Sequence, residues 1–292
     1  MKTEAISDAY KDLDSWSFEK TLDTIIDSNR RAVEAVAKTL PQLTQAAEGI
    51  ASRLESGGRL VYVGAGTSGR LAVQDAAELP PTFGFERHLV LMAGGNKAEG
   101  SAVEGAEDDA DEAREAVAED IDERDAVVGL AASGRTPYTV AGIQEARKRG
   151  AFTVGVANNA GASLLSVAEI GIFLDTGPEV LAGSTRLAAG TSQKIVLNAL
   201  STSVLVRLGG AYQNLMVGMQ PKNIKLRERA AAIVSSGAGV STEDARAALE
   251  ASNWQMREAI VMLKAGVSFA EARERLEASG NRVRDALKSD GR

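Results

Sequence analysis

The chain has 292 residues, a net charge of −7, no cysteine and one histidine, His88. Disulfides, thiolate metal sites and thiol nucleophiles are therefore excluded, and a histidine metal cluster cannot form, so no metal site is predicted. Acidic and basic residues are mixed along the chain without a basic face, which argues against nucleic-acid binding. Neither a signal peptide nor an apolar run of bilayer length is visible, so we expect a cytoplasmic protein.

Helical and strand patterns alternate along the chain. Apolar residues at helical spacing over 22–54 predict a helix that continues past Pro41 and ends at Gly57-Gly58. Short apolar runs predict buried strands at 60–63, 89–92, 127–130, 152–156 and 170–174. An Ala-, Glu- and Asp-rich stretch over 98–119 is helical by propensity, which would place Glu104 and Glu107 near one another on a helix. Residues 184–208 predict a long buried helix.

Short strands that alternate with helices predict an α/β fold, with a parallel sheet flanked by helices on both faces. Ligands in such folds bind at the carboxyl ends of the strands. After about residue 230 the pattern changes to three short helices, two of them opened by the capping sequences Ser241-x-x-Asp244 and Ser268-x-x-Glu271. We therefore predict a domain at 1–230 and a small all-helical domain at 231–292, the latter with a structural or dimer-stabilising role.

Two loops of similar chemistry follow the first and third predicted strands. The first reads Gly64-Ala-Gly-Thr-Ser-Gly69 and the second reads Ser133-Gly-Arg-Thr136. The first has the form of a dinucleotide fingerprint, but the second strand ends without the carboxylate that would hold a ribose. Backbone N–H groups, hydroxyls and a helix N-terminus together bind a phosphate. The loops predict a site for a small phosphorylated ligand; tight turns that merely need glycine are the alternative.

Long motifs in the chain resemble the N-acetylmuramic acid 6-phosphate etherase family, which carries a sugar-isomerase (SIS) domain. The motifs run from about residue 13 to the C-terminus and read VGAGTSGRLAVQDAAELPPTFG, VEGAEDD, GLAASGRTPYTVAG, GPEVLAGSTRLAAGTSQKIVLNALST and NLMVGMQPKNIKLRERA. The resemblance implies a three-layer SIS fold, a homodimer and a C-terminal domain similar to ubiquitin-associated domains. It also implies a sugar-phosphate substrate and a reaction without metal, nucleotide or other cofactor, in peptidoglycan recycling.

The resemblance implies two catalytic carboxylates. Glu78 matches the glutamate of an ECPPT-like motif and is assigned to lactate departure and water addition. Glu107 matches the glutamate of an EGAED motif and is assigned to proton abstraction beside the aldehyde of the opened sugar. Sequence spacing alone does not bring these two residues together. The predicted substrate- and phosphate-binding residues are Gly66, Thr67, Ser68, Ser133, Gly134, Thr136, Glu179 and Ser184.

The chain departs from the family at two positions that bear on specificity. The family usually has a lysine in the segment Arg186–Gly190, where this chain has Ala188, and often an aspartate where it has Gly218. Two other functions stay open at this point. One is a sugar-phosphate sensor without catalysis, which would not need both glutamates; the other is an aldose–ketose isomerase with Glu179 or another carboxylate as base.

Overall fold

The computed structural model describes residues 1–101 and 103–288. The chain forms two compact units, one of Met1–Ala76 with Arg87–Ser201 and one of Ala77–Glu86 with Thr202–Arg292. Two of the three boundaries between them fall inside helices α3 (Gly66–Phe83) and α8 (Ala188–Leu205), and the third lies between Glu86 and Arg87, after α3. The two units are defined by their compactness. The predicted domains 1–230 and 231–292 concern which segments fold independently, and they stay a prediction.

The first unit contains a five-stranded sheet of order β2-β1-β3-β4-β5, and every pair of neighbouring strands is parallel. The strands are β1 (Leu60–Gly64), β2 (His88–Met92), β3 (Ala126–Leu130), β4 (Phe152–Ala157) and β5 (Ile170–Phe173). All five lie at the predicted positions. Strands β1, β3 and β4 are buried along their whole length, as expected for a parallel sheet covered on both faces.

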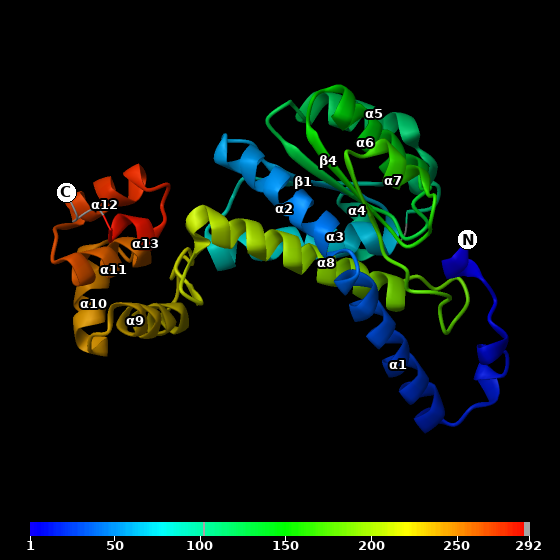
Figure 1. The fold of residues 1–292 in the computed structure, drawn as a ribbon, viewed down its shortest axis with the longest axis horizontal. Helices are drawn as coiled ribbons and strands as arrows, with labels where there is room; N and C mark the ends of the chain where they lie inside the picture. Colours follow the sequence, from blue (N-terminus) through cyan, green and yellow to red (C-terminus); the bar gives the residue numbers. More distant parts are fainter. Residues whose placement is uncertain (102, 289–292) are drawn as a thin grey trace. The chain divides into compact units, whose positions relative to one another are not determined.

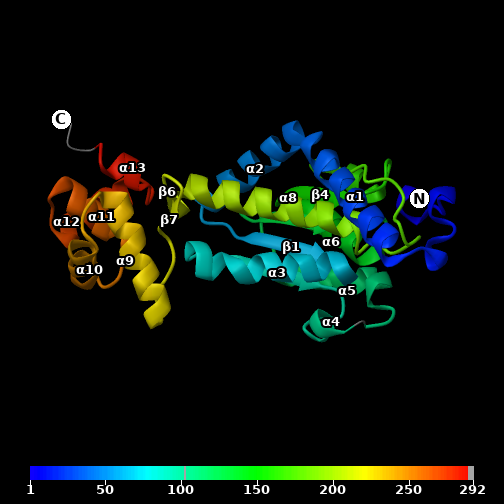
Figure 2. The same ribbon diagram turned by 90° about the horizontal axis from the view of Figure 1, so that it is seen from below.

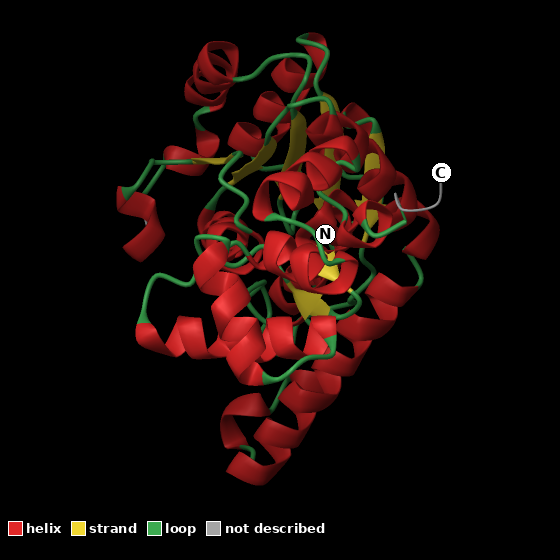
Figure 3. Ribbon diagram, turned by 90° about the vertical axis from the view of Figure 1, so that its left-hand side faces the viewer, coloured by secondary structure: helices red, strands yellow, loops and turns green. Residues whose placement is uncertain are grey.

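Helices cover both faces of the sheet, which gives the predicted three layers. Helices α5, α6 and α7 lie on one face, and α2 lies with α3 and α8 on the other (Figures 1 and 2). The helices of this unit are α1 (Phe18–Ala37), α2 (Leu40–Glu55), α4 (Lys97–Gly100), α5 (Ala110–Asp120), α6 (Pro137–Lys148) and α7 (Ser163–Val167). Figure 3 distinguishes the strands, in yellow, from the helices, in red. Among the described residues, no helix is both long enough and apolar enough to cross a membrane.

Two predicted helices are interrupted. The helix expected over 22–54 is two helices, α1 and α2, and Pro41 lies in the first turn of α2, where its missing N–H costs nothing. The helix expected over 98–119 is wrong in its first half: α4 ends at Gly100, a 3-10 turn spans Ala106–Asp108, and α5 begins after its N-cap Asp109. Gly105 has a φ of 76°, a left-handed conformation that a continuous helix does not contain.

The second unit is mainly helical. It contains a short hairpin of β6 (Ala211–Tyr212) and β7 (Leu215–Met216), followed by α9 (Ile224–Ala238), α10 (Thr242–Ala251), α11 (Met256–Ala265), α12 (Phe269–Ala278) and α13 (Val283–Ala286). Ser241 and Ser268 are the predicted N-caps and accept from the N–H groups of Asp244 and Glu271. The core of this unit includes Val234, Leu249, Ile260 and Leu276. The unit contains the three predicted short helices and, in addition, the longer α9 and the one-turn helix α13.

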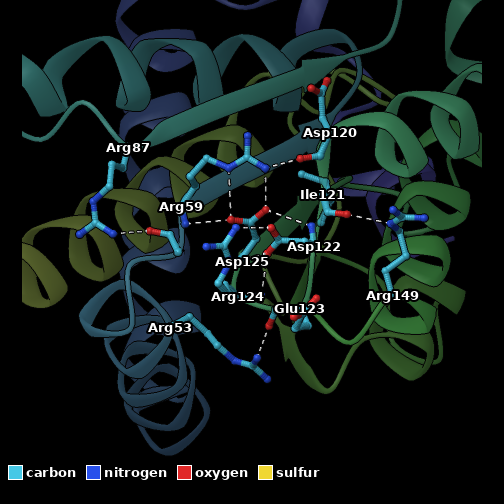
Figure 4. Close-up of polar contacts among 11 residues, drawn as sticks. Arg53, Arg59, Arg87, Asp120, Ile121, Asp122, Glu123, Arg124, Asp125 and Arg149 are labelled. Atoms are coloured by element: carbon cyan, nitrogen blue, oxygen red, sulfur yellow. Dashed lines mark hydrogen bonds and ion pairs between the residues drawn. The ribbon is translucent and has the colours of Figure 1, made fainter.

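A cluster of arginines holds the loop 120–125 at the amino-terminal edge of the sheet (Figure 4). Arg53, Arg59 and Arg149 donate to backbone carbonyls of this loop. At its centre, the buried carboxylate of Asp125 accepts from Arg59 Nη2 at 2.7 Å and from the N–H of Arg59 at 2.9 Å. The hydrogen bond that Arg59 donates to Asp125 raises the pKa of the Arg59 guanidinium. Because these cations are engaged and lie at the opposite edge from the strand ends that precede the glycine loops, the cluster is structural.

We predict that Asp125→Ala lowers the free energy of unfolding by about 2–3 kcal/mol, because it leaves backbone N–H groups and a half-buried guanidinium without their acceptor. Asp111→Ala, which removes the exposed ion pair with Arg114, is the control and should cost less than about 0.5 kcal/mol. Urea unfolding followed by circular dichroism measures both values. Equal losses in the two variants would contradict a structural role for Asp125.

Candidate functional site

The two predicted loops lie next to one another at the carboxyl edge of the sheet. Strands β1 and β3 are paired so that Gly64 stands opposite Leu130, and each strand runs directly into a loop and a helix. In the first loop, a Cβ at Gly64 would lie only 3.0 Å from the Cα of Gly69, so the turn into α3 requires glycine. In the second, Gly134 has a φ of 63°, and a Cβ there would lie 2.4 Å from the Cβ of Ala162. Gly134 therefore shapes its loop.

One cleft of about 360 Å³ in the first unit is bounded by both loops. The 3-10 turn after Gly105 and the segment before α8 complete its wall, together with residues near the beginning of the chain. The predicted site residues that line it are Gly66, Thr67, Ser68, Glu107, Ser133 and Thr136. Sequence spacing alone did not bring Glu107 to these loops; the sheet topology does.

Helix N-termini and hydroxyls give the cleft its chemistry. Helix α3 begins at Gly66 and α6 at Pro137, so two helix N-termini lie at the cleft, with partial positive charge and first-turn N–H groups that have no partner within their helices. Ser133 Oγ accepts from the N–H of Arg135 at 3.1 Å and lies 3.3 Å from Thr136 Oγ1. This combination of donors is suited to an oxyanion.

A buried amide network positions the first loop, and the sequence did not reveal it. Ser68 Oγ donates to Gln193 Oε1 at 2.8 Å, and Gln193 Nε2 donates to Asn158 Oδ1 at 3.2 Å. The side chain of Asn158 donates in turn to Ser192 Oγ at 2.9 Å. Asn158, Ser192 and Gln193 are fully buried. The hydroxyl proton of Ser68 is therefore directed at Gln193, and its oxygen remains as an acceptor. One signal in the sequence could have indicated the network: the otherwise apolar helix contains the polar run Thr191-Ser192-Gln193.

Glu78 lies in the second unit. It is exposed on α3, two residues before Pro80, and lines a pocket of about 370 Å³. The other charged residues of this pocket are Glu86, Lys222 and Arg229, and Met216 and Met219 supply apolar wall. Glu78 is thus absent from the residues that line the cleft of the first unit, where Glu107 lies.

Comparisons with known proteins agree on one family. The chain is 47% identical over 261 residues to an N-acetylmuramic acid 6-phosphate etherase of Deinococcus radiodurans, covering 88% of this chain and 86% of that protein. It is 45% identical to the enzyme of that name from Geobacillus thermodenitrificans, covering 89% of each chain. The chain belongs to the N-acetylmuramic acid 6-phosphate etherase family.

Domain models and solved structures support the same fold. The model of the glucokinase regulatory protein N-terminal SIS domain matches residues 42–147, and the SIS domain model matches residues 103–203. The structure of a putative phosphosugar isomerase involved in capsule formation from Bacteroides fragilis is similar with a TM-score of 0.51 and 19% identity, covering 66% of this chain and 94% of that one. The predicted SIS-type fold is confirmed.

The two departures from the family pattern lie at tightly packed positions. Ala188 is fully buried in the first turn of α8. A Cβ at Gly218 would lie 2.2 Å from the carbonyl oxygen of Phe83, so the backbone there has no room for a side chain. In this member of the etherase family, residue 188 is therefore a small buried side chain, and residue 218 has no space for a side chain.

Glu179 and Ser184 were predicted to bind substrate, and neither is among the residues that line the cleft. The buried carboxylate of Glu179 accepts from the N–H groups of Ala188 and Ala189 at 3.0 and 2.9 Å, and so caps the N-terminus of α8. Burial raises the pKa of this carboxyl group. The backbone N–H of Ser184 donates to Leu181 in the loop before α8, whose Gly183 and Thr185 do line the cleft. Substrate binding by Glu179 and Ser184 stays a prediction.

The raised pKa of Glu179 predicts a pH dependence of stability. The folded state binds this proton more tightly than the unfolded state, whose carboxyl pKa is about 4.3. The stabilisation that this proton contributes to the wild-type protein is therefore lost as pH rises from that value through the raised folded-state pKa. Glu179→Gln does not titrate, so its stability relative to wild type should increase over this range. Urea unfolding of both proteins at several pH values measures the difference; a difference independent of pH would contradict the shift.

Proposed function

We propose that this chain cleaves the D-lactyl ether of N-acetylmuramic acid 6-phosphate to N-acetylglucosamine 6-phosphate and D-lactate, acting in amino-sugar recycling in the cytoplasm. The observation that carries the proposal is a cleft in which two helix N-termini, the hydroxyls of Thr67, Ser133 and Thr136, and Glu107 meet. The identity of about 45–47% to etherases over most of the chain supports the same reaction.

The reaction proceeds by elimination and then hydration. The opened sugar has an aldehyde at C1, which acidifies the hydrogen on C2. In our proposal Glu107 removes this proton as a base, while Glu78 acts as an acid and protonates the ether oxygen at C3 as it leaves with lactate. An unsaturated aldehyde remains. Glu78, now ionised, takes a proton from the water that adds at C3, and Glu107 returns the proton to C2.

The phosphate binds at the loops in this proposal. The N-termini of α3 and α6 supply backbone N–H groups and the favourable end of two helix dipoles. Thr67, Ser133 and Thr136 supply hydroxyl donors, and Ser68 holds the first loop against α8 through Gln193. Gly66 allows the backbone to approach the ligand, and Gly134 shapes the second loop.

A homodimer belongs to the proposal for two reasons. Helix α1 carries exposed apolar side chains on one face, Phe18, Leu22, Ile26 and Val33, which suits a protein–protein interface. The second reason lies in the two glutamates. Glu107 lines the cleft, whereas Glu78 lines a different pocket. Because the reaction needs both carboxylates at one sugar, the Glu78 that serves a cleft comes, in this proposal, from a second copy of the chain.

The reaction itself is tested with purified protein and N-acetylmuramic acid 6-phosphate. We expect release of D-lactate that is unaffected by chelators, and incorporation of oxygen from labelled water into the sugar. Label in lactate would exclude the elimination route. A ketose product without lactate would favour an isomerase, and ligand binding without any product would favour a sensor.

The roles of the glutamates are tested with Glu78→Gln and Glu107→Gln. Each should lower turnover about 100- to 10,000-fold, the usual contribution of general acid–base catalysis. Glu107→Gln should also abolish exchange of the C2 hydrogen with heavy water, whereas Glu78→Gln should retain some exchange and release little lactate. Glu104→Gln, an exposed neighbour that does not line the cleft, is the control and should be fully active. Loss of exchange in Glu78→Gln alone would reverse the two roles.

Co-expression of the two inactive variants tests the shared site. Random pairing gives heterodimers in which one cleft has both native glutamates, so about a quarter of wild-type activity should return. Failure to recover activity would mean that the two glutamates do not meet between copies.

A further inference from the structure

Two residues near the beginning of the described chain are part of the cleft wall. Met1 and Glu4 line the cleft, whereas Thr3 between them is fully buried. Figure 1 shows this segment beside the loop that leads into α8. Since Thr3 is buried between exposed neighbours, the segment is docked on the first unit, and its exposed side chains have a defined place.

The side chain of Asn159, at the end of β4, anchors the segment. Its Oδ1 accepts from the N–H of Lys2 at 2.7 Å and from the N–H of Thr3 at 3.3 Å. Its Nδ2 donates to Thr3 Oγ1 at 2.9 Å and to the carbonyl of Ala132, also at 2.9 Å. An amide has two acceptor sites and two donor hydrogens, so this buried group is saturated. Saturated buried networks rigidify the elements that they join.

The same amide couples the segment to the phosphate-type loop. Ala132 directly precedes Ser133, and the N–H of Asn158 also donates to the Ala132 carbonyl at 3.0 Å. On the other side, Lys2 Nζ lies 2.8 Å from Asp175 Oδ1, after β5. Residues 2 and 3 are thus tied to the segments that follow β3, β4 and β5. Glu4, the next residue, is therefore held at a fixed distance from Ser133.

The carboxylate of Glu4 is available to a ligand. Within residues 1–101 and 103–288, no hydrogen bond or ion pair engages it. A carboxylate repels a phosphate dianion but accepts hydrogen bonds from hydroxyl and amide N–H groups. The cleft therefore combines an anion-binding part, at the two helix N-termini, with acceptors for neutral donors at Glu4.

We propose that Glu4 is a substrate-contacting residue that accepts a hydrogen bond from a hydroxyl or the amide N–H of the sugar. It thereby favours a sugar phosphate over phosphate alone, and Asn159 is the residue that positions it. The inference rests on the proposed function for the class of ligand, a hexosamine phosphate. It adds a specificity determinant outside both glycine loops.

The test compares two ligands, N-acetylglucosamine 6-phosphate and inorganic phosphate, by isothermal titration calorimetry. Glu4→Ala should weaken binding of the sugar phosphate about 10- to 100-fold, the usual effect of losing a charged hydrogen-bond partner. Binding of inorganic phosphate should stay the same or tighten, because a like charge has been removed. Glu4→Gln keeps an acceptor oxygen and should recover part of the sugar-phosphate affinity.

Asp8→Ala, which removes an exposed carboxylate outside the cleft, is the matched control and should leave both affinities unchanged. Unchanged sugar-phosphate affinity in Glu4→Ala would overturn the proposal, and so would an equal loss for both ligands, which would indicate a general defect of the cleft. These binding results do not depend on lactate release. A wild-type protein that releases no lactate would therefore refute the proposed reaction and leave the role of Glu4 to be decided by calorimetry.

Discussion

The close pairing of β1 with β3 is the constraint on which the site depends. Gly64 and Leu130 stand opposite one another, so the loops that follow these strands must leave the sheet side by side. The loops then turn into α3 and α6 with their N-termini at one edge. Neither loop alone would distinguish a tight turn from a binding site. Placed together, they create a region of unpaired N–H groups and favourable helix dipoles at which an anion is stabilised.

Burial of polar groups behind this edge fixes the loops. Gln193 and Asn158 are fully buried, and their amides are held by hydrogen bonds that lead from Ser68 to α8 and to Leu174, just after β5. Asn159, the next residue, performs the same task on the other side by joining Ala132 to residues 2 and 3. Because an unpaired buried amide is costly, such networks have one favourable arrangement. The cleft walls are thus preorganised by a second layer of side chains that need not touch a ligand.

The two ends of helix α3 have different chemistry. Its first turn lies at the cleft, with Thr67 and Ser68, whereas its last turns carry Glu78 and two adjacent prolines and line a pocket with Lys222 and Arg229. Between these ends, buried Asp75 accepts from Tyr62 at 2.8 Å, and Lys194 lies 3.7 Å away. Desolvation and the nearby carboxylate raise the pKa of the Tyr62 hydroxyl, which keeps it protonated as the donor. The helix is therefore fixed to β1 and α8 midway along its length.

The sequence by itself determined the strands, the two loops, the N-caps Ser241 and Ser268, and the family, because these depend on local patterns and on long motifs. It was wrong about 98–119, where helical propensity is high but Gly100 and Gly105 interrupt the helix. Only the tertiary structure brought Glu107 to the loops, placed Glu179 under the first turn of α8, and added Met1 and Glu4 to the cleft wall. These relations join segments that are far apart in the sequence. They depend on strand order and on where buried amides find partners, and no local pattern of residues encodes either.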